Sequence, residues 1–196
     1  MVVPNTNTNE SPPPAINLLV FYTVIGALLS FGFGKEIRTL TTATITLEEI
    51  IPTILVISLF LMSYSMLDVM AVANARASHG HGSQSKTFDP MVKNPPEDVH
   101  LALRAQANQV EQLPIYLVAA LSFSLLVNGT VGAILSAIWA ILRRFYAKAY
   151  RSSVGKTWEE SGISNYTVPA YIVVNSMLMG TVVHCVRFFS WEWLLW

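Results

Sequence analysis

Residues 47–72 read LEEIIPTILVISLFLMSYSMLDVMAV, and Asp68 is the only charged residue in this run after Glu49. A run this long and apolar can cross a bilayer, because about 20 residues of α-helix span a hydrocarbon core about 30 Å thick. Glu48 and Glu49 fit the first turn of such a helix, where the helix dipole favours negative charge. The stretch therefore predicts a membrane-spanning helix.

Four further apolar runs predict the rest of the fold. They cover approximately residues 15–34, 97–127, 131–150 and 168–189. Backbone groups in lipid have no water to bind, so such segments form helices that satisfy their own hydrogen bonds. We predict an all-α integral membrane protein whose four-transmembrane-helix bundle covers residues 47–190.

The segments outside this bundle have simpler compositions. Residues 1–14 are polar and proline-rich, which predicts a flexible tail. Residues 15–46 predict an additional N-terminal hydrophobic helix with its connector, and this helix could be a fifth span or lie in the membrane plane. Residues 191–196 contain three tryptophans and predict an aromatic anchor at the membrane surface.

The overall composition excludes several classes of protein. Of the 196 residues, 53% are hydrophobic and only 12% are charged, against about 25% charged in an ordinary soluble domain. Twelve basic residues balance twelve acidic ones, so we expect no nucleic-acid partner. Cys185 is the only cysteine, which excludes an internal disulfide and a thiolate metal cluster. His79 and His81 lie in a loop-like segment without neighbouring carboxylates, so we predict no metal site.

Basic residues in the loops predict the orientation. They gather in the loop at residues 73–96 and in and beside the connector at residues 151–166, whereas the turn at residues 128–130 has none. The positive-inside rule therefore places both basic loops in the cytoplasm and the turn on the lumenal side. Lys35 and Arg38 run against this rule.

The third apolar run begins with a polar stripe. Arg104, Asn108 and Glu111 are spaced i, i+4 and i+7, so they share one helical face. His100 extends that face by one turn, and Gln106 lies off it. Charges at this depth are costly and usually face a cavity or each other.

The fourth run carries a second polar face, made of Arg143, Tyr146 and Tyr150. Two interpretations of the two faces remain open. One is a buried structural ion pair between Arg104 and Glu111. The other is a site for a small zwitterion with several carboxylates, such as glutathione, because arginine binds carboxylates through a fork of donors. The lone Asp68 is expected either to cap a polar cavity or to pair with a nearby arginine, Arg76.

The motif R-x-x-x-N-x-x-E-x-x-P at residues 104–114 resembles the signature of the MAPEG family, the membrane-associated proteins of eicosanoid and glutathione metabolism. Its RAQ opening is most similar to the cysteinyl-leukotriene synthase and microsomal glutathione transferase branches. The spacing R-x-x-Y-x-x-x-Y at residues 143–150 is similar to the third-helix pattern of the family. The resemblance covers about residues 48–190. It implies a homotrimer in the endoplasmic reticulum membrane, with glutathione bound between adjacent subunits on the cytoplasmic side.

The resemblance also implies roles for individual residues. The glutathione-binding set is Arg104, Gln106, Asn108 and Glu111 of one subunit, Arg143, Tyr146 and Tyr150 of its neighbour, and, by a looser alignment, Arg76. Two departures concern catalysis. Gln112 stands where family synthases carry a bulky residue, and the expected arginine beyond the last tyrosine is not at its usual spacing. Arg151 and Lys156 are therefore our candidates for the cation that stabilises the thiolate.

The predicted function is that of a membrane-bound glutathione transferase or peroxidase. It would conjugate glutathione to lipophilic electrophiles or reduce lipid hydroperoxides, with the second substrate arriving through membrane lipid. The alternative is a non-catalytic protein of the same fold that presents lipid or forms part of a larger membrane complex. A transporter is disfavoured, because the spans show no pair of broken helices.

Overall fold

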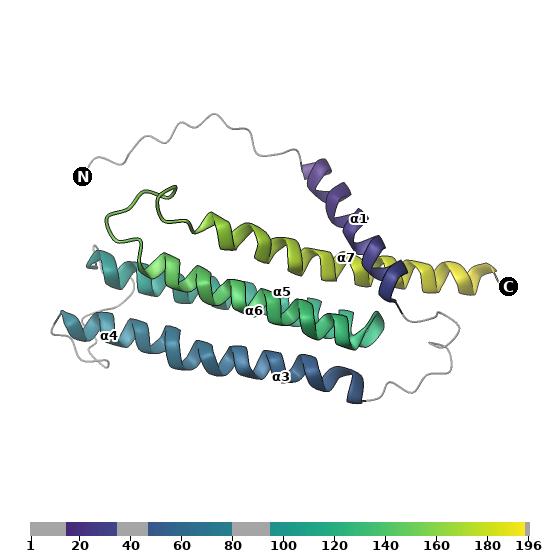
Figure 1. Ribbon diagram of the computed structural model, residues 1–196, viewed down its shortest axis with the longest axis horizontal. Helices are drawn as coiled ribbons and strands as arrows, with labels where there is room; N and C mark the ends of the chain where they lie inside the picture. Colours follow the sequence, from purple (N-terminus) through teal and green to yellow (C-terminus); the bar gives the residue numbers. More distant parts are fainter. Residues whose placement is uncertain (1–14, 35–46, 80–94, 195–196) are drawn as a thin grey trace.

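The computed structural model describes residues 15–34, 47–79 and 95–194, and these residues are all helical or connecting, without strands (Figure 1). The predicted tail at residues 1–14 and the connector at residues 35–46 lie outside the described residues, as do His81 and the side chains of the predicted anchor at residues 191–196. The elements are α1 (Ala15–Phe33), α3 (Leu47–Ser63), η1 (Tyr64–Val69), α4 (Met70–Ser78), α5 (Glu97–Leu126), α6 (Gly129–Arg151) and α7 (Ser164–Leu194).

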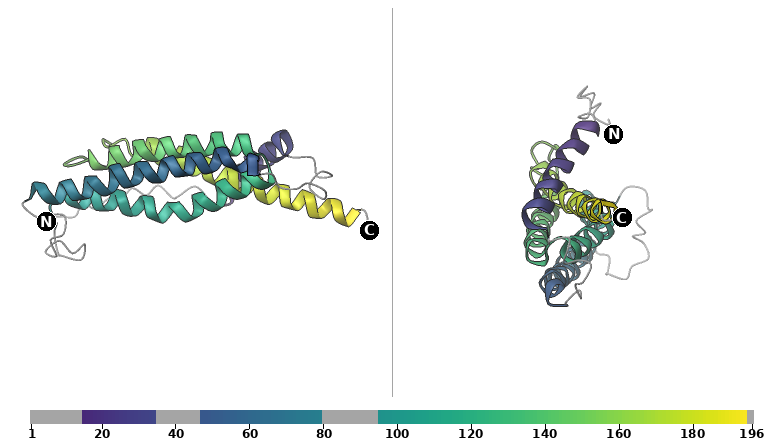
Figure 2. Two further views of the ribbon diagram at one scale, coloured as in Figure 1. Left: turned by 90° about the horizontal axis from the view of Figure 1, so that it is seen from below. Right: turned by 90° about the vertical axis from the view of Figure 1, so that its right-hand side faces the viewer.

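Among the described residues, four helices are long and apolar enough to cross a membrane. One is the continuous helix Leu47–Ser78, formed by α3, η1 and α4, and the others are Glu97–Leu126, Gly129–Arg151 and Ser164–Ser190. They lie side by side in both views of Figure 2, and α5 is visibly curved along its length. The predicted all-helical class with four long apolar helices is confirmed. The chain is an integral membrane protein.

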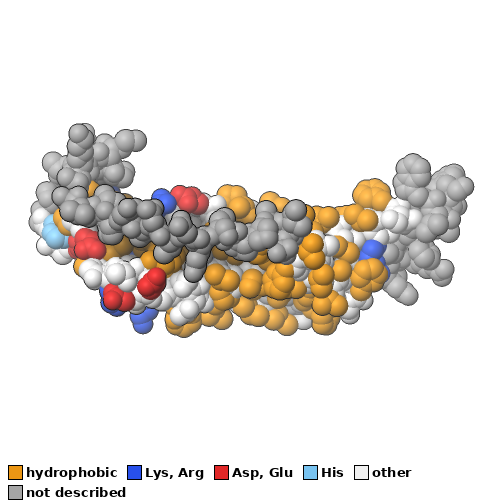
Figure 3. Space-filling view, turned by 90° about the horizontal axis from the view of Figure 1, so that it is seen from above, with side chains coloured by type: hydrophobic (Ala, Val, Ile, Leu, Met, Phe, Trp, Pro, Cys, Tyr) orange, Lys and Arg blue, Asp and Glu red, His pale blue; other side chains and the backbone are white. Residues whose placement is uncertain are grey.

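The distribution of charge along the bundle fits this assignment. On the face shown in Figure 3, charged side chains gather toward one end and hydrophobic side chains cover the middle. We call this end, where α4 and α6 finish and α5 and α7 begin, the connector end. There the connector after α6 contacts the start of α5, because the Gly155 amide donates to the Glu97 carboxylate at 3.0 Å. Both basic loops of the sequence leave the bundle at the connector end.

An aromatic cluster forms the centre of the bundle. The rings of Tyr116 and Trp139 stack with their centroids 3.8 Å apart, and Phe60 meets both rings edge-on at 6.0 and 5.1 Å. All three side chains are buried. Since α3, α5 and α6 each contribute one ring, this cluster sets the relative position of the helices that carry the polar residues.

Helix α1 crosses α7 obliquely (Figure 1). A Cβ added at Gly26 would lie 2.6 Å from the Met179 backbone, so the absence of a side chain permits the close crossing. Beyond the crossing, the Arg187 guanidinium donates to the Ser30 carbonyl at 2.7 Å. Residues Ala15–Phe33 therefore form a helix docked on α7, shorter than the four long helices.

The π-helical turn η1 was not predicted from the sequence, which indicated one uniform helix. In a regular α-helix of 3.6 residues per turn, Leu67 would return to the face of Phe60 after two turns. A turn closed by i→i+5 hydrogen bonds takes in more residues. The inward position therefore falls to Asp68, which is 1% exposed, while Leu67 faces outward.

Candidate functional site

A pocket of about 610 Å³ lies between η1 and α5 at the connector end. Its polar lining includes Arg104, Gln106 and Glu111, and its apolar walls come from neighbouring positions on α5. The full lining is Tyr64, Pro95, His100, Leu103, Arg104, Gln106, Ala107, Val110 and Glu111. Helical spacing places Gln106 off the face of Arg104, yet the pocket is wide enough to include both.

The pair formed by Arg104 and Glu111 is long and open. The Arg104 guanidinium lies 3.9 Å from the Glu111 carboxylate, and the two side chains are 54% and 58% exposed. A pair in this setting contributes at most about 1 kcal/mol to stability. Within one chain the interpretation as a buried structural ion pair is therefore wrong. Both charges face the pocket and remain able to bind a ligand.

Asn108, Arg143 and Tyr146 form a second polar group, between α5 and α6. The Arg143 Nη2 donates to the Asn108 carbonyl at 2.7 Å, and the Asn108 amide donates to the Tyr146 hydroxyl at 2.5 Å. The Arg143 guanidinium also stacks 4.3 Å from the centroid of the Tyr146 ring. With Arg143 only 3% exposed, these residues join two helices of the same chain.

Gln109 completes this interhelical group and was missed from the sequence. Its Oε1 accepts from Arg143 Nε at 2.7 Å, and its amide donates to the Arg143 carbonyl at 2.9 Å. A glutamine so deep in a helix pair needs both of its polar atoms satisfied. The sequence held one signal for Gln109: it is a polar residue directly after Asn108, on the side of α5 that faces α6.

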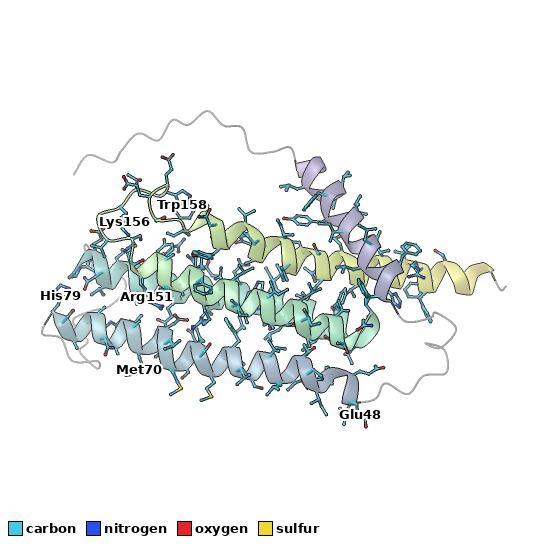
Figure 4. All side chains as sticks on the ribbon, viewed as in Figure 1. Glu48, Met70, His79, Arg151, Lys156 and Trp158 are labelled. Carbon is cyan, nitrogen blue, oxygen red and sulfur yellow. The ribbon has the colours of Figure 1, made fainter. Side chains whose placement is uncertain are left out.

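The remaining predicted site residues lie around the connector end. Tyr150 is half-buried and its ring centroid is 5.6 Å from that of Tyr146. Arg76 lies on α4 and is not part of the pocket lining. Lys156 is exposed on the connector between α6 and α7, whereas Arg151 is partly buried at the end of α6 (Figure 4). The two cations proposed for the thiolate are thus in different environments.

Asp68 has partners that the sequence did not indicate. The expected pairing with Arg76 is wrong, because Asp68 accepts from Arg144 Nη2 at 2.5 Å and from Arg151 Nη1. The partners lie on α6, far along the chain, so only the isolation of this charge in an apolar run could have drawn attention to it. Arg151, a predicted catalytic cation, is therefore held by a buried carboxylate.

His79 also differs from the expectation of a histidine without carboxylate neighbours. Its Nε2 lies 2.9 Å from the Asp98 carboxylate and joins the end of α4 to the start of α5. Within the described ranges, no three histidine, cysteine or acidic side chains come together in a way that could hold a metal ion.

A bundle of four long apolar helices with a polar pocket at one end defines a membrane-embedded protein of the all-α class. A family model described as the MAPEG family matches residues 51–159, which is more than half of the chain. The chain belongs to the MAPEG family. It is also similar to a protein of Synechocystis sp. that is described as uncharacterized, with 32% identity over 111 residues, 57% of this chain and 75% of that protein. No solved structure matches the chain significantly.

Proposed function

We propose that this MAPEG protein is a membrane-bound glutathione transferase or peroxidase. The observation that carries the proposal is the pocket in which Arg104, Gln106 and Glu111 meet. Glutathione has two carboxylates and one ammonium group. A guanidinium fork suits a carboxylate, and the Glu111 carboxylate suits the ammonium group. The exposure of both charged side chains leaves them available for such a ligand.

The second substrate in this proposal is a lipophilic electrophile or a lipid hydroperoxide. Leu103, Ala107 and Val110 give the pocket an apolar wall beside its polar groups. The outward faces of the long helices are also apolar, so a lipophilic molecule can approach from membrane lipid. Two substrates of opposite polarity would thus meet at the boundary of the bilayer.

The proposed assembly is a homotrimer in the endoplasmic reticulum membrane, with the connector end in the cytoplasm. Arg143 and Tyr146 are bonded to α5 of their own chain, so we assign them the task of fixing the position of α5. Tyr150 and Arg151 at the end of α6 are then the groups that a neighbouring subunit would bring to bound glutathione. The proposed activity is most similar to that of the glutathione transferase and leukotriene synthase branches of the MAPEG family.

A second candidate is a non-catalytic lipid-presenting or structural member of the family. One observation favours it: within the described part of the chain, no lysine and no arginine besides Arg104 lines the pocket. A thiol of ordinary pKa, about 8.5, is mostly protonated at neutral pH and needs a nearby cation to react. Without a neighbouring subunit to supply that cation, the pocket would bind glutathione and leave it unreactive.

Turnover by the purified protein in lipid nanodiscs separates the two candidates. Glutathione is supplied with an aromatic halide in one assay and with a lipid hydroperoxide in the other. Turnover that Arg104→Ala abolishes and Lys148→Ala preserves supports the enzyme, because Lys148 is an exposed cation of the same end outside the pocket lining. Binding of glutathione without turnover on either substrate supports the non-catalytic protein. Chemical cross-linking of the same sample tests the trimer.

A further inference from the structure

A buried carboxylate ties the π-helical turn to the last turn of α6. The Asp68 side chain is completely covered, whereas its partners Arg144 and Arg151 are 20% and 25% exposed. Each arginine takes a different oxygen of the carboxylate. The insertion of η1 is what turns Asp68 toward α6, as described above, and π-helical turns are frequent at functional sites.

The Asp68 cluster (Asp68, Arg144 and Arg151) carries one negative and two positive charges. Within the described ranges, no second carboxylate pairs with either arginine. The cluster therefore holds a positive charge in a fixed place rather than neutralising it.

The two arginines are placed differently. The Arg144 guanidinium covers the Phe60 ring at 4.9 Å from its centroid and faces an apolar groove between α3 and α6. Arg151 follows Tyr150, the last residue of the proposed glutathione set, at the open end of α6. Asp68 occupies one of the five N–H donors of Arg151. Asp68 takes one donor of Arg144 in the same way, so the choice between them rests on position. Arg144 lies over the Phe60 ring, whereas Arg151 ends α6 beside Tyr150, and we assign Arg151 to the ligand.

We infer that Asp68 is a positioning residue that holds the Arg151 guanidinium where it pairs with the sulfur of bound glutathione. The inference rests on the proposed function and deepens it. The thiol loses its proton to solvent water, and the thiolate that remains pairs with the Arg151 guanidinium. Asp68 itself touches neither substrate.

The test follows the ultraviolet absorbance of the thiolate as a function of pH in the glutathione-bound protein, for the unaltered chain and for Asp68→Asn, Arg151→Gln and Arg144→Gln. We expect Arg151→Gln to raise the apparent thiol pKa by about one unit or more, since one unit is about 1.36 kcal/mol of lost interaction. We expect Asp68→Asn to raise it similarly, and to add nothing in the Arg151→Gln background. Arg144→Gln removes the same charge from the same carboxylate, and we expect it to raise the thiol pKa by much less than Arg151→Gln.

The sign of the Asp68→Asn effect distinguishes positioning from a simple charge effect. Removing a negative charge without moving Arg151 would strengthen the positive field and lower the thiol pKa, which would overturn the inference. An unchanged thiol pKa with a lower melting temperature would mean that the Asp68 cluster only holds the helices together. That result would also overturn the inference. Where Asp68→Asn folds poorly, the Arg151→Gln and Arg144→Gln comparison still decides, because equal shifts in both would refute the assignment to Arg151.

The proposed function can fail separately. If calorimetry shows that the unaltered protein binds no glutathione, the proposed function and this inference fall together. If it binds glutathione and Asp68→Asn leaves the thiolate profile unchanged, only the inference falls.

Discussion

Replacing Arg143 with methionine removes a buried cation and keeps most of its aliphatic volume. The substitution deletes the hydrogen bonds that Arg143 donates to the Asn108 carbonyl and to Gln109 Oε1, both 2.7 Å long. A hydrogen bond to a charged group contributes about 1.5–3 kcal/mol, and an orphaned buried acceptor adds to the cost. Arg143→Met should therefore lower the free energy of unfolding by about 3–6 kcal/mol, the sum for two hydrogen bonds to a charged group.

The matched variant is Arg104→Ala, on the pocket side of the same helix pair. Its side chain is 54% exposed and its ion pair is 3.9 Å long, so the expected loss is under about 1 kcal/mol. Both losses are measured by reversible unfolding of detergent-solubilised protein in a denaturing detergent. A double-mutant cycle of Arg143→Met with Gln109→Leu should give a coupling energy of about 1–3 kcal/mol. Equal losses for Arg143→Met and Arg104→Ala, or a coupling energy near zero, would refute the division into an interhelical group and a pocket.

Three further substitutions test the fold. Trp139→Ala should cost about 3–5 kcal/mol of unfolding free energy in the same assay, because the ring is fully packed between two aromatic neighbours; a loss below about 1 kcal/mol would contradict this packing. Gly26→Val should separate α1 from α7 and expose it to limited proteolysis, because an added Cβ would meet the α7 backbone, whereas Gly32→Ala has open space and should leave digestion unchanged. Deleting Leu67 should convert η1 to a regular α-turn with Asp68 seven residues after Phe60, still facing α6, so the melting temperature should change by only a few degrees; collapse of the fold would show that the register argument is wrong.

The spans were predictable because their signal is local. Each depends on a run of apolar residues about as long as a bilayer is thick, and the described helices begin and end within a few residues of most predicted bounds. The turn at Asn128 was also readable, since its side chain accepts from the Val131 amide at 3.0 Å as a helix N-cap does. The π-helical turn could not be predicted, because one additional residue in a uniformly apolar run does not change the composition of that run.

The site was predictable in part for the same reason. Spacing along one helix brought Arg104 and Glu111 to one face, and the structure places both on one pocket. Asn108 has the same spacing, but it donates to the Tyr146 hydroxyl on α6 and does not line the pocket. Residues on one face of a curved helix can thus point to two different neighbours. The partners of Asp68 lie 76 and 83 residues away, and no pattern within a single helix indicates a contact of that kind.

The central claim is that the pocket between η1 and α5 binds glutathione through Arg104. Isothermal titration calorimetry of glutathione into the protein in nanodiscs tests it most directly, with Arg104→Ala and the control Lys148→Ala. Loss of a charge-assisted contact of about 1.5–3 kcal/mol predicts at least about tenfold weaker binding for Arg104→Ala and unchanged binding for Lys148→Ala. Equal affinity for glutathione in the unaltered protein and in Arg104→Ala would contradict the claim.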